Sequence, residues 1–260
     1  MRKSIIEFRV KENLRISDMY SVLKLTPDDG GRIPASIPGQ FVQVAVSNSK
    51  STFLRRPISI NRVDRKENTL WLLIRNAGDG TRALIESPVG MTISVIYPLG
   101  NGFSIPNPES GTNRHLLLVG GGVGVAPLLE LGIVLKESGF TPQFLLGARS
   151  KNDLLLIEEF EKVGNVHIAT DDGSAGHQGV VTTHSVMSRY WDQIYCCGPA
   201  PMMKAVASMA KKTGSPCEVS LENMMACGLG ACLCCVENTV KGNVCVCTEG
   251  PVFNINELTW

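Results

Sequence analysis

"HLLLVGGGVGVAPLLELGIVLKESG", residues 115–139, decides the fold of the central part of this 260-residue chain. Its apolar start predicts a buried strand, its glycines a tight turn, and the rest a helix that ends at Gly139. Further strands are expected in "TPQFLLGARS", "VHIAT" and "QIYCCGP", and further helices in "DLLLIEEFEKVG", "GVVTTHSVMSR" and "APMMKAVASMAKKTG". Strands and helices that alternate in this way predict a Rossmann-like α/β domain with a doubly wound parallel sheet.

The residues before this domain have a different pattern. Short β-rich runs, "QFVQVAV", "PISINRV", "TLWLLIR" and "TISVIY", are separated by Gly, Pro and Asn and predict a small antiparallel β-barrel or sandwich. The polar stretch "NPESGTNR" (Asn107–Arg114) is the expected linker. We therefore expect a multidomain α+β chain with a barrel in residues 1–106, the α/β domain in residues 107–215 and a loop-rich cysteine module in residues 216–260.

The composition is that of a globular protein, with 43% hydrophobic and 19% charged residues. A formal net charge of +1 gives no electrostatic signature of a nucleic-acid or anionic-membrane partner. The N-terminus lacks the apolar core of a signal peptide and no stretch approaches transmembrane length, so we expect a cytoplasmic protein. In a reducing compartment, clustered cysteines indicate metal or redox chemistry more often than disulfides.

The cysteine module has the spacing of a metal centre. Cys227, Cys232 and Cys235 follow the pattern C-x₄-C-x₂-C with a later fourth cysteine, which is typical of a plant-type [2Fe-2S] centre. A zinc site is the alternative, but zinc ribbons usually present two C-x₂-C pairs, and here only Cys232 and Cys235 form one. Cys245 and Cys247 would point to the same face of an extended stretch. The alternation of side chains along a strand therefore does not show which of these two cysteines is the fourth ligand.

Three glycine- or arginine-containing stretches are candidate phosphate-binding segments. "GGGVGVAP" (Gly120–Pro127) follows a strand and opens a helix, so its N–H groups can approach a pyrophosphate; the alternative is a merely tight turn. "RRPISI" (Arg55–Ile60) offers a guanidinium that can clamp a phosphate, or else a charged edge strand. "GDGTRALIESPVG" supplies a turn and a short helix that starts near Thr81.

The ordered set of motifs resembles a known family: the electron-transfer subunit of NAD-linked (type 1B) dihydroorotate dehydrogenase, within the ferredoxin-reductase superfamily. The resemblance covers nearly the whole chain. It is carried by "GQFVQV", "LRRPISI", "GDGT", "PLGNGF", "GGGVGVAPLL", "GARSKNDLL", "TDDGSAGHQGVVT", "CCGPAPMMKAV", "ENMMACGLGACLCC" and "CTEGPVF".

This resemblance implies three cofactor sites. FAD is expected at Arg56, Pro57, Ile58, Ser59, Leu73, Ile74, Arg75, Gly80 and Thr81, with Ile58 standing where the superfamily usually has Tyr. NAD is expected at Gly121, Gly122, Gly124, Cys197, Gly198 and Pro199. The family's fourth cluster ligand precedes x-x-G-P-V-F, which makes the implied [2Fe-2S] ligands Cys227, Cys232, Cys235 and Cys247.

The resemblance also implies a function. Electrons would pass from a partner subunit, an FMN-containing (β/α)₈ dihydroorotate dehydrogenase, through the cluster and FAD to NAD⁺ in pyrimidine (UMP) biosynthesis. Such a barrel needs about 250 residues, so it must be a separate chain, and a heterotetramer of two copies of each is expected. We nominate no catalytic acid or base. The alternatives are a flavin/iron–sulfur subunit of a hydrogenase or sulfide dehydrogenase, and a non-catalytic zinc-stapled interaction protein.

Overall fold

The computed structural model describes residues 2–47, 49 and 51–260 and divides the chain into two compact units. The first unit comprises Met1–Gly102, Asn223–Glu237 and Val244–Gly250, and the second comprises Phe103–Glu222, Asn238–Asn243 and Pro251–Trp260. Residues 223–250, here called the cysteine-rich segment, are thus divided between the two units. All four predicted cluster ligands belong to the first unit. The three domain ranges expected above stay a prediction.

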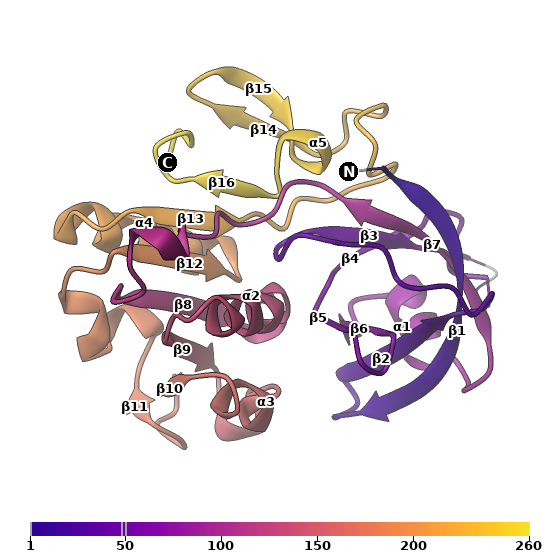
Figure 1. Ribbon diagram of the computed structural model, residues 1–260, viewed down its shortest axis with the longest axis horizontal. Helices are drawn as coiled ribbons and strands as arrows, with labels where there is room; N and C mark the ends of the chain where they lie inside the picture. Colours follow the sequence, from indigo (N-terminus) through magenta and orange to yellow (C-terminus); the bar gives the residue numbers. More distant parts are fainter. Residues whose placement is uncertain (1, 48, 50) are drawn as a thin grey trace. The chain divides into compact units, whose positions relative to one another are not determined.

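The first unit is built on a curled antiparallel sheet of seven strands in the order β4-β3-β7-β1-β2-β6-β5 (Figure 1). Its elements are β1 (Ser4–Arg15), β2 (Tyr20–Pro27), β3 (Phe41–Val44), β4 (Arg56–Ser59), β5 (Arg62–Asp64), β6 (Thr69–Arg75), α1 (Asp79–Ile85) and β7 (Thr92–Leu99). Strands β4 and β5 lie at opposite ends of the pairing order, yet only Ile60 and Asn61 join them. The sheet must therefore curl so that its two end strands come close together. The predicted antiparallel β-domain is confirmed, and its curled sheet forms a half-barrel.

The hydrophobic core of this unit fills the inside of the curl. It includes residues from every long strand, among them Phe8, Val10, Leu23, Leu25, Val42, Val44, Leu72, Ile74, Val95 and Tyr97. Because successive side chains of a strand point to opposite faces, Val42 and Val44 place the intervening Gln43 on the outer face of β3.

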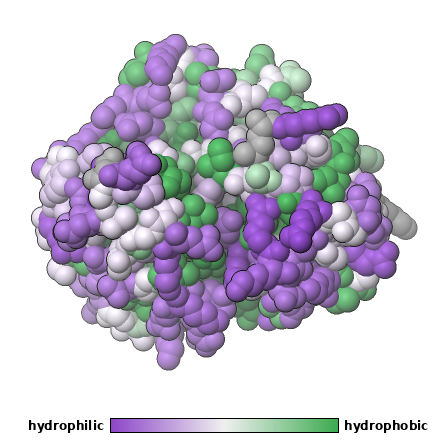
Figure 2. Space-filling model, in the orientation of Figure 1, coloured by the Kyte–Doolittle hydropathy of each residue, from purple (hydrophilic) through white to green (hydrophobic). Residues whose placement is uncertain are grey.

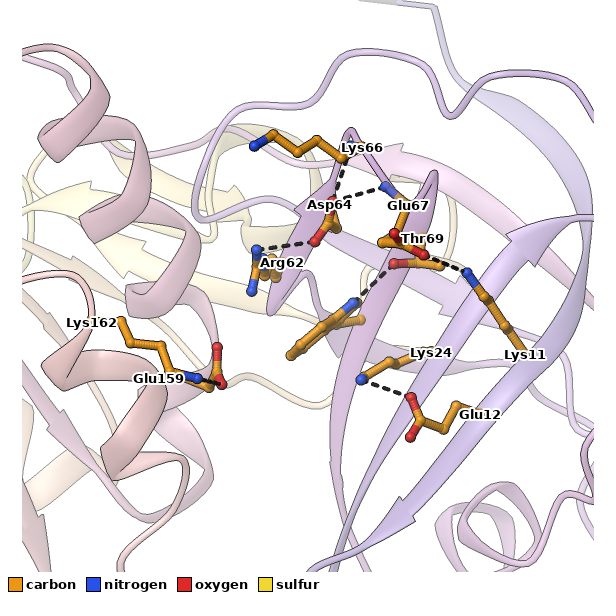
Figure 3. A network of polar contacts seen from close by, with 11 residues as sticks. Lys11, Glu12, Lys24, Arg62, Asp64, Lys66, Glu67, Thr69, Glu159 and Lys162 are labelled. Carbon is orange, nitrogen blue, oxygen red and sulfur yellow. Dashed lines mark hydrogen bonds and ion pairs between the residues drawn. The ribbon is translucent and has the colours of Figure 1, made fainter.

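Charged side chains cover part of the outer face of β1, β2, β5 and β6 (Figure 3). Lys24 Nζ lies 2.7 Å from Glu12 Oε2 and 4.2 Å from the centre of the Trp71 ring. The Arg62 guanidinium pairs with Asp64 at 3.0 Å and lies 4.8 Å from the same ring. These side chains are partly covered but still reach solvent, and ion pairs near the surface contribute little, typically about 0–1 kcal/mol each.

The second unit contains a sheet in the order β11-β10-β9-β8-β12-β13-β16, in which only β16 runs antiparallel to its neighbour. Its elements are β8 (Leu116–Gly121), α2 (Ala126–Glu137), β9 (Pro142–Ala148), α3 (Ile157–Glu161), β10 (Asn165–Thr170), β11 (His177–Gln178), β12 (Gln193–Cys197), α4 (Ala200–Thr213), β13 (Cys217–Ser220) and β16 (Val252–Asn254). The chain order reverses between β8 and β12, which is the switch point of a doubly wound sheet. The predicted Rossmann-like domain is confirmed.

Two expected helices differ from the prediction. "GVVTTHSVMSR" forms two short 3₁₀ helices, η4 (Val181–Thr183) and η5 (Ser185–Ser188), because its β-branched residues disfavour an α-helix. The extended His184 separates the two, and its Nδ1 accepts the N–H of Val186 at 3.2 Å. In "DLLLIEEFEKVG" the helix is shortened to α3, since Leu156 immediately before it adopts a left-handed backbone with φ of 56°.

The cysteine-rich segment ends in a hairpin and a single helical turn. Strands β14 (Val236–Thr239) and β15 (Gly242–Cys245) pair with each other and lead directly into α5 (Val246–Glu249). Figure 2 shows hydrophobic residues interspersed with hydrophilic ones over the visible face of the molecule. In the part of the chain that the structure describes, no helix is long and apolar enough to cross a membrane.

Candidate functional site

Backbone N–H groups point at the sulfurs of the predicted cluster ligands. The N–H of Leu229 donates to Cys227 Sγ at 3.3 Å, and the N–H of Gly230 donates to Cys247 Sγ at 3.1 Å. The N–H of Cys247 donates in turn to Cys235 Sγ at 3.4 Å. Such donors stabilise negative charge on sulfur, which is what thiolate ligands of an iron–sulfur centre require. The donor set therefore fits the predicted cluster.

The cysteine thiols differ in how readily they ionise. The pKa of Cys227 is lowered to about 6, chiefly because the N–H of Leu229 donates to its sulfur, and Cys232 adds a further hydrogen bond. Cys227 is therefore largely a thiolate at neutral pH, the form that binds metals. Burial raises the pKa of Cys247 to about 12, with a hydrogen bond to Cys235 as the next cause. A metal must displace the proton of Cys247 on binding.

The two candidates for the fourth ligand lie close together. Burial and then the neighbouring Cys235 sulfur raise the pKa of Cys245, so this thiol also faces the ligand group. Cys247 is buried and receives the N–H of Gly230, whereas Cys245 is half-buried and Cys234 is exposed. A [2Fe-2S] centre distributes four thiolates over two irons. Among the described residues, no group of three or more His, Cys, Asp or Glu side chains is arranged to hold one metal ion.

Two contacts anchor the cysteine-rich segment to the curled sheet of the first unit. Asn101, just after β7, donates from Nδ2 to the carbonyls of Thr248 at 3.1 Å and Glu249 at 2.9 Å. These carbonyls belong to α5, which carries Cys247, and helix-end carbonyls need such partners.

The second contact is made by residues 227–232, here called the cluster loop, which pack against β3. A methyl group built on Gly228 would lie only 2.7 Å from Gln43 Cγ and 2.8 Å from Gln43 Nε2. Gly228 also has a φ of 69°, which side-chain-bearing residues rarely adopt. The cluster loop can therefore approach the sheet only because this position has no side chain.

The nine predicted FAD residues converge at one end of the curled sheet. Strand β4 contacts β6, and α1 contacts β6 as well. A methyl group on Gly80 would collide with Arg56 Nε and lie 3.1 Å from its Cζ, so the guanidinium rests against the backbone of α1. Thr81 fixes the turn before the helix, since its Oγ1 accepts the N–H of Ala77 at 2.8 Å and donates to Gly78 O at 3.1 Å. A guanidinium beside a side-chain-free backbone suits a phosphate.

The FAD residues predicted on β6 could contact a ligand mainly through their backbone groups. The pairing of β5 with β6 ends at Trp71, so Leu73, Ile74 and Arg75 lie beyond the edge that β5 covers. The side chains of Leu73 and Ile74 are buried, and Ile74 belongs to the core. On β4, Ile58 also packs against this core, which gives a ligand at this end an aliphatic wall in place of a stacking ring.

The structure separates the roles of the two adjacent arginines. Arg55 Nη1 donates to Ser94 O at 2.7 Å and to Gln43 O at 3.3 Å, and its Nη2 donates to Ser94 Oγ at 3.0 Å. Arg55 therefore ties β3 to β7. Arg56 lies half-buried against Gly80, its Nη1 donates to the carbonyls of Leu54 at 3.2 Å and Arg55 at 3.3 Å, and its role toward a phosphate stays a prediction.

The predicted NAD residues meet at the switch point of the second unit. A methyl group on Gly124 would lie 2.5 Å from Gly198 Cα and 2.7 Å from the carbonyl carbon of Cys197, so the turns that follow β8 and β12 touch through their backbones. A methyl group on Gly121 would lie 3.3 Å from Pro199 Cδ. Gly122 has a φ of 55°, and a methyl group added there would meet nothing within 4 Å. The crevice at a switch point is the usual place for a dinucleotide.

Comparison with known proteins agrees with this architecture. Residues 222–259 match the family model of the iron-sulfur cluster binding domain of dihydroorotate dehydrogenase B, and residues 118–208 match that of an oxidoreductase NAD-binding domain. A solved structure of the NADH-dependent reduced ferredoxin-NADP oxidoreductase is 30% identical with a TM-score of 0.82, covering 97% of this chain and 90% of that one. The ferredoxin reductase in carbazole 1,9a-dioxygenase shares the fold, with a TM-score of 0.68 at 23% identity, covering 83% of this chain and 68% of that one. The class is thus a ferredoxin-reductase-like oxidoreductase with an iron–sulfur module.

Curated relatives identify the family. The dihydroorotate dehydrogenase B (NAD(+)) electron transfer subunit of Shouchella clausii is 42% identical over 228 residues, 86% of each chain. The protein of the same name from Listeria monocytogenes is 40% identical over 260 residues, covering 97% of this chain and 98% of that one. The chain belongs to the family of electron transfer subunits of NAD-dependent dihydroorotate dehydrogenase B.

Membership confirms the predicted family, the oxidoreductase electron-transfer role and the cofactor set of FAD, iron–sulfur cluster and NAD. The relatives favour this reading over a hydrogenase or sulfide dehydrogenase subunit and over a zinc-stapled interaction protein. Gln43 and Asn101 lie in the family motifs "GQFVQV" and "PLGNGF", but the sequence alone predicts no role for either of them. The sequence signal that could have identified Gln43 was a single glutamine within an apolar run.

We predict that Gly228→Ala weakens cluster retention because the added methyl group would press on Gln43. The left-handed backbone costs an alanine about 1–2 kcal/mol, and overpacking typically adds about 1–3 kcal/mol. Gly242→Ala is the matched control, because Gly242 also has a positive φ, of 99°, but nothing within 4 Å. Iron content per chain measures the effect; equal iron in the two variants would contradict the importance of the Gly228 contact.

Proposed function

We propose that this chain carries electrons from a dihydroorotate-oxidising FMN subunit, through a [2Fe-2S] cluster and FAD, to NAD⁺. The observation that carries the proposal is the packing of the cluster loop onto β3, whose partner strand β4 holds Arg56 to Ser59. The residues proposed for cluster and flavin thus share one compact unit. FAD exchanges electrons in pairs with NAD and singly with an iron–sulfur centre, so it couples the two.

The chain's own residues supply binding and orientation. The cluster is proposed to be held by Cys227, Cys232, Cys235 and Cys247. Backbone N–H groups donate to the sulfurs of Cys227, Cys235 and Cys247. Arg56 and Gly80 are proposed to hold an FAD phosphate, and the end of β6 to receive the rest of the flavin through its backbone. The glycine turns that follow β8 and β12 are proposed to bind NAD.

The surface around Cys232 suits a protein partner. Cys232 is exposed, and large apolar side chains near it in the chain are exposed as well: Met224 by 84%, Leu233 by 65% and Leu229 by 45%. Exposed apolar side chains around a redox centre favour docking of the protein that delivers electrons. We propose that this surface binds the FMN-containing (β/α)₈ catalytic subunit, in a heterotetramer of two copies of each chain. A cytoplasmic location is also part of the proposal.

The fourth cluster ligand can be tested by paired substitutions. Cys247→Ser should lose most of the bound iron, because it removes the sulfur that accepts the Gly230 N–H. Cys245→Ser should keep its iron, since the neighbouring thiol remains in place. The measurement is the iron and sulfide content of both purified variants. Loss of iron in Cys245→Ser with retention in Cys247→Ser would make Cys245 the ligand.

The flavin site can be tested on the two arginines. Arg56→Ala should weaken FAD retention roughly tenfold or more without unfolding, because a charge-assisted hydrogen bond is worth roughly 1.5–3 kcal/mol. Arg55→Ala should instead lower the thermal midpoint, because it unties β3 from β7. Flavin content and melting curves of both variants check this. Unchanged flavin in Arg56→Ala would remove that residue from the site.

The function itself is tested by co-expression with a dihydroorotate dehydrogenase catalytic subunit. The two chains should co-purify and catalyse dihydroorotate-dependent reduction of NAD⁺. Leu233→Ser should reduce complex formation while iron and flavin stay bound, whereas Val240→Ser, equally apolar and 62% exposed, serves as the control. A chain that holds both cofactors but neither binds the partner nor supports NAD⁺ reduction would overturn the proposed function.

A further inference from the structure

Gln43 stands out among the buried polar residues of the first unit. All four residues of β3 are buried, and Gln43 is 0% exposed. Neither Oε1 nor Nε2 of its side chain has a hydrogen-bond partner within the described residues. Buried amides in native proteins are nearly always hydrogen-bonded, so a side chain left in this state indicates a group that faces a ligand.

The surroundings of Gln43 show which ligand it faces. On the outer face of β3, its Nε2 lies against Gly228 of the cluster loop, 2.8 Å from a methyl group built there. Gly228 directly follows Cys227, whose sulfur already receives the N–H of Leu229. Across the sheet, Gln43 is paired with Pro57 of β4. Gln43 therefore lies on the strand next to the proposed flavin strand, and its amide lies against the loop that carries proposed cluster ligands.

A nearby glutamine shows what a purely structural amide looks like in this sheet. Gln40 is 5% exposed, and both ends of its side chain are bonded. Its Oε1 accepts the N–H of Ile37 at 2.8 Å, and its Nε2 donates to Gly100 O at 2.7 Å. The same unit thus satisfies one buried glutamine completely and leaves the other, which faces the cluster loop, without a partner among the described residues.

We propose that Gln43 Nε2 donates a hydrogen bond to a sulfur of the iron–sulfur centre and thereby raises the reduction potential of that centre. The proposal rests on the function proposed above and adds a specific residue to it. A donor stabilises the additional negative charge of the reduced centre more than it stabilises the oxidised one, so the potential rises. Because Gly228 has no side chain, no Cβ separates the amide from the backbone of the cluster loop.

The test compares two matched substitutions in the full chain with cluster and FAD bound. Gln43→Met keeps the length of the side chain but removes the donor, and it should shift the midpoint potential of the centre to a more negative value. Gln40→Met removes two structural hydrogen bonds and should lower the thermal midpoint without shifting that potential. A redox titration followed by electron paramagnetic resonance reports the centre, and flavin absorbance in the same titration should give an unchanged flavin potential.

A second measurement detects the proposed hydrogen bond directly in the wild-type chain. With the side-chain nitrogen of glutamine isotopically labelled, pulsed electron paramagnetic resonance of the wild-type reduced centre should show a coupling to one glutamine nitrogen. Gln43→Met should lose that coupling, and Gln40→Met should keep it. If Gln43→Met does not retain iron, Gln43→Leu, which also lacks a donor and adds no charge, is measured in its place.

The outcomes separate this inference from the function on which it rests. An unchanged midpoint potential in an iron-loaded Gln43 variant, a shift of the flavin potential alone, or no glutamine coupling in the wild type would each overturn the role of Gln43. Each of these results leaves electron transfer by the intact chain in place. Failure of the wild-type chain to bind iron or flavin would instead refute the proposed function.

Discussion

The close packing of the cluster loop on strand β3 is the contact on which the arrangement of the redox site depends. Gly228 brings the loop backbone against Gln43, and Asn101 holds the carbonyls of α5, which carries Cys247. Because β3 pairs with β4, this packing fixes the cysteine-rich segment one strand away from Arg56. Without it, the segment would be a loop whose thiols have no defined relation to the flavin end of the sheet.

Glycines in close contact with a neighbouring group recur at each of the proposed cofactor sites. Gly80 lies against the Arg56 guanidinium, and Gly124 lies against Gly198 where the turns after β8 and β12 meet. A glycine at such a point lets N–H groups come close to an anionic group, which a Cβ would hold away. The proposed anions differ, with phosphates at two sites and sulfur at the third, but the steric requirement is the same.

Local chemistry in the sequence was enough to predict the curled antiparallel sheet, the parallel sheet and the metal-like spacing of Cys227, Cys232 and Cys235. Periodicity failed where a single residue overrode its neighbours. The left-handed Leu156 shortened α3. Around His184, β-branched residues disfavour an α-helix, and the extended His184 lies between the two 3₁₀ helices that form instead. Propensity describes an average over a window, whereas one backbone torsion ends a helix.

The sequence by itself determined which elements form and which residue types can bind metal and phosphate, because those properties belong to short stretches of chain. Only the tertiary structure decided which of two adjacent arginines ties strands together and which lies against Gly80. It alone placed Gln43, a single polar letter in an apolar run, beside the cluster loop with no partner for its amide among the described residues. These roles depend on contacts between residues far apart in the chain, which no local pattern encodes.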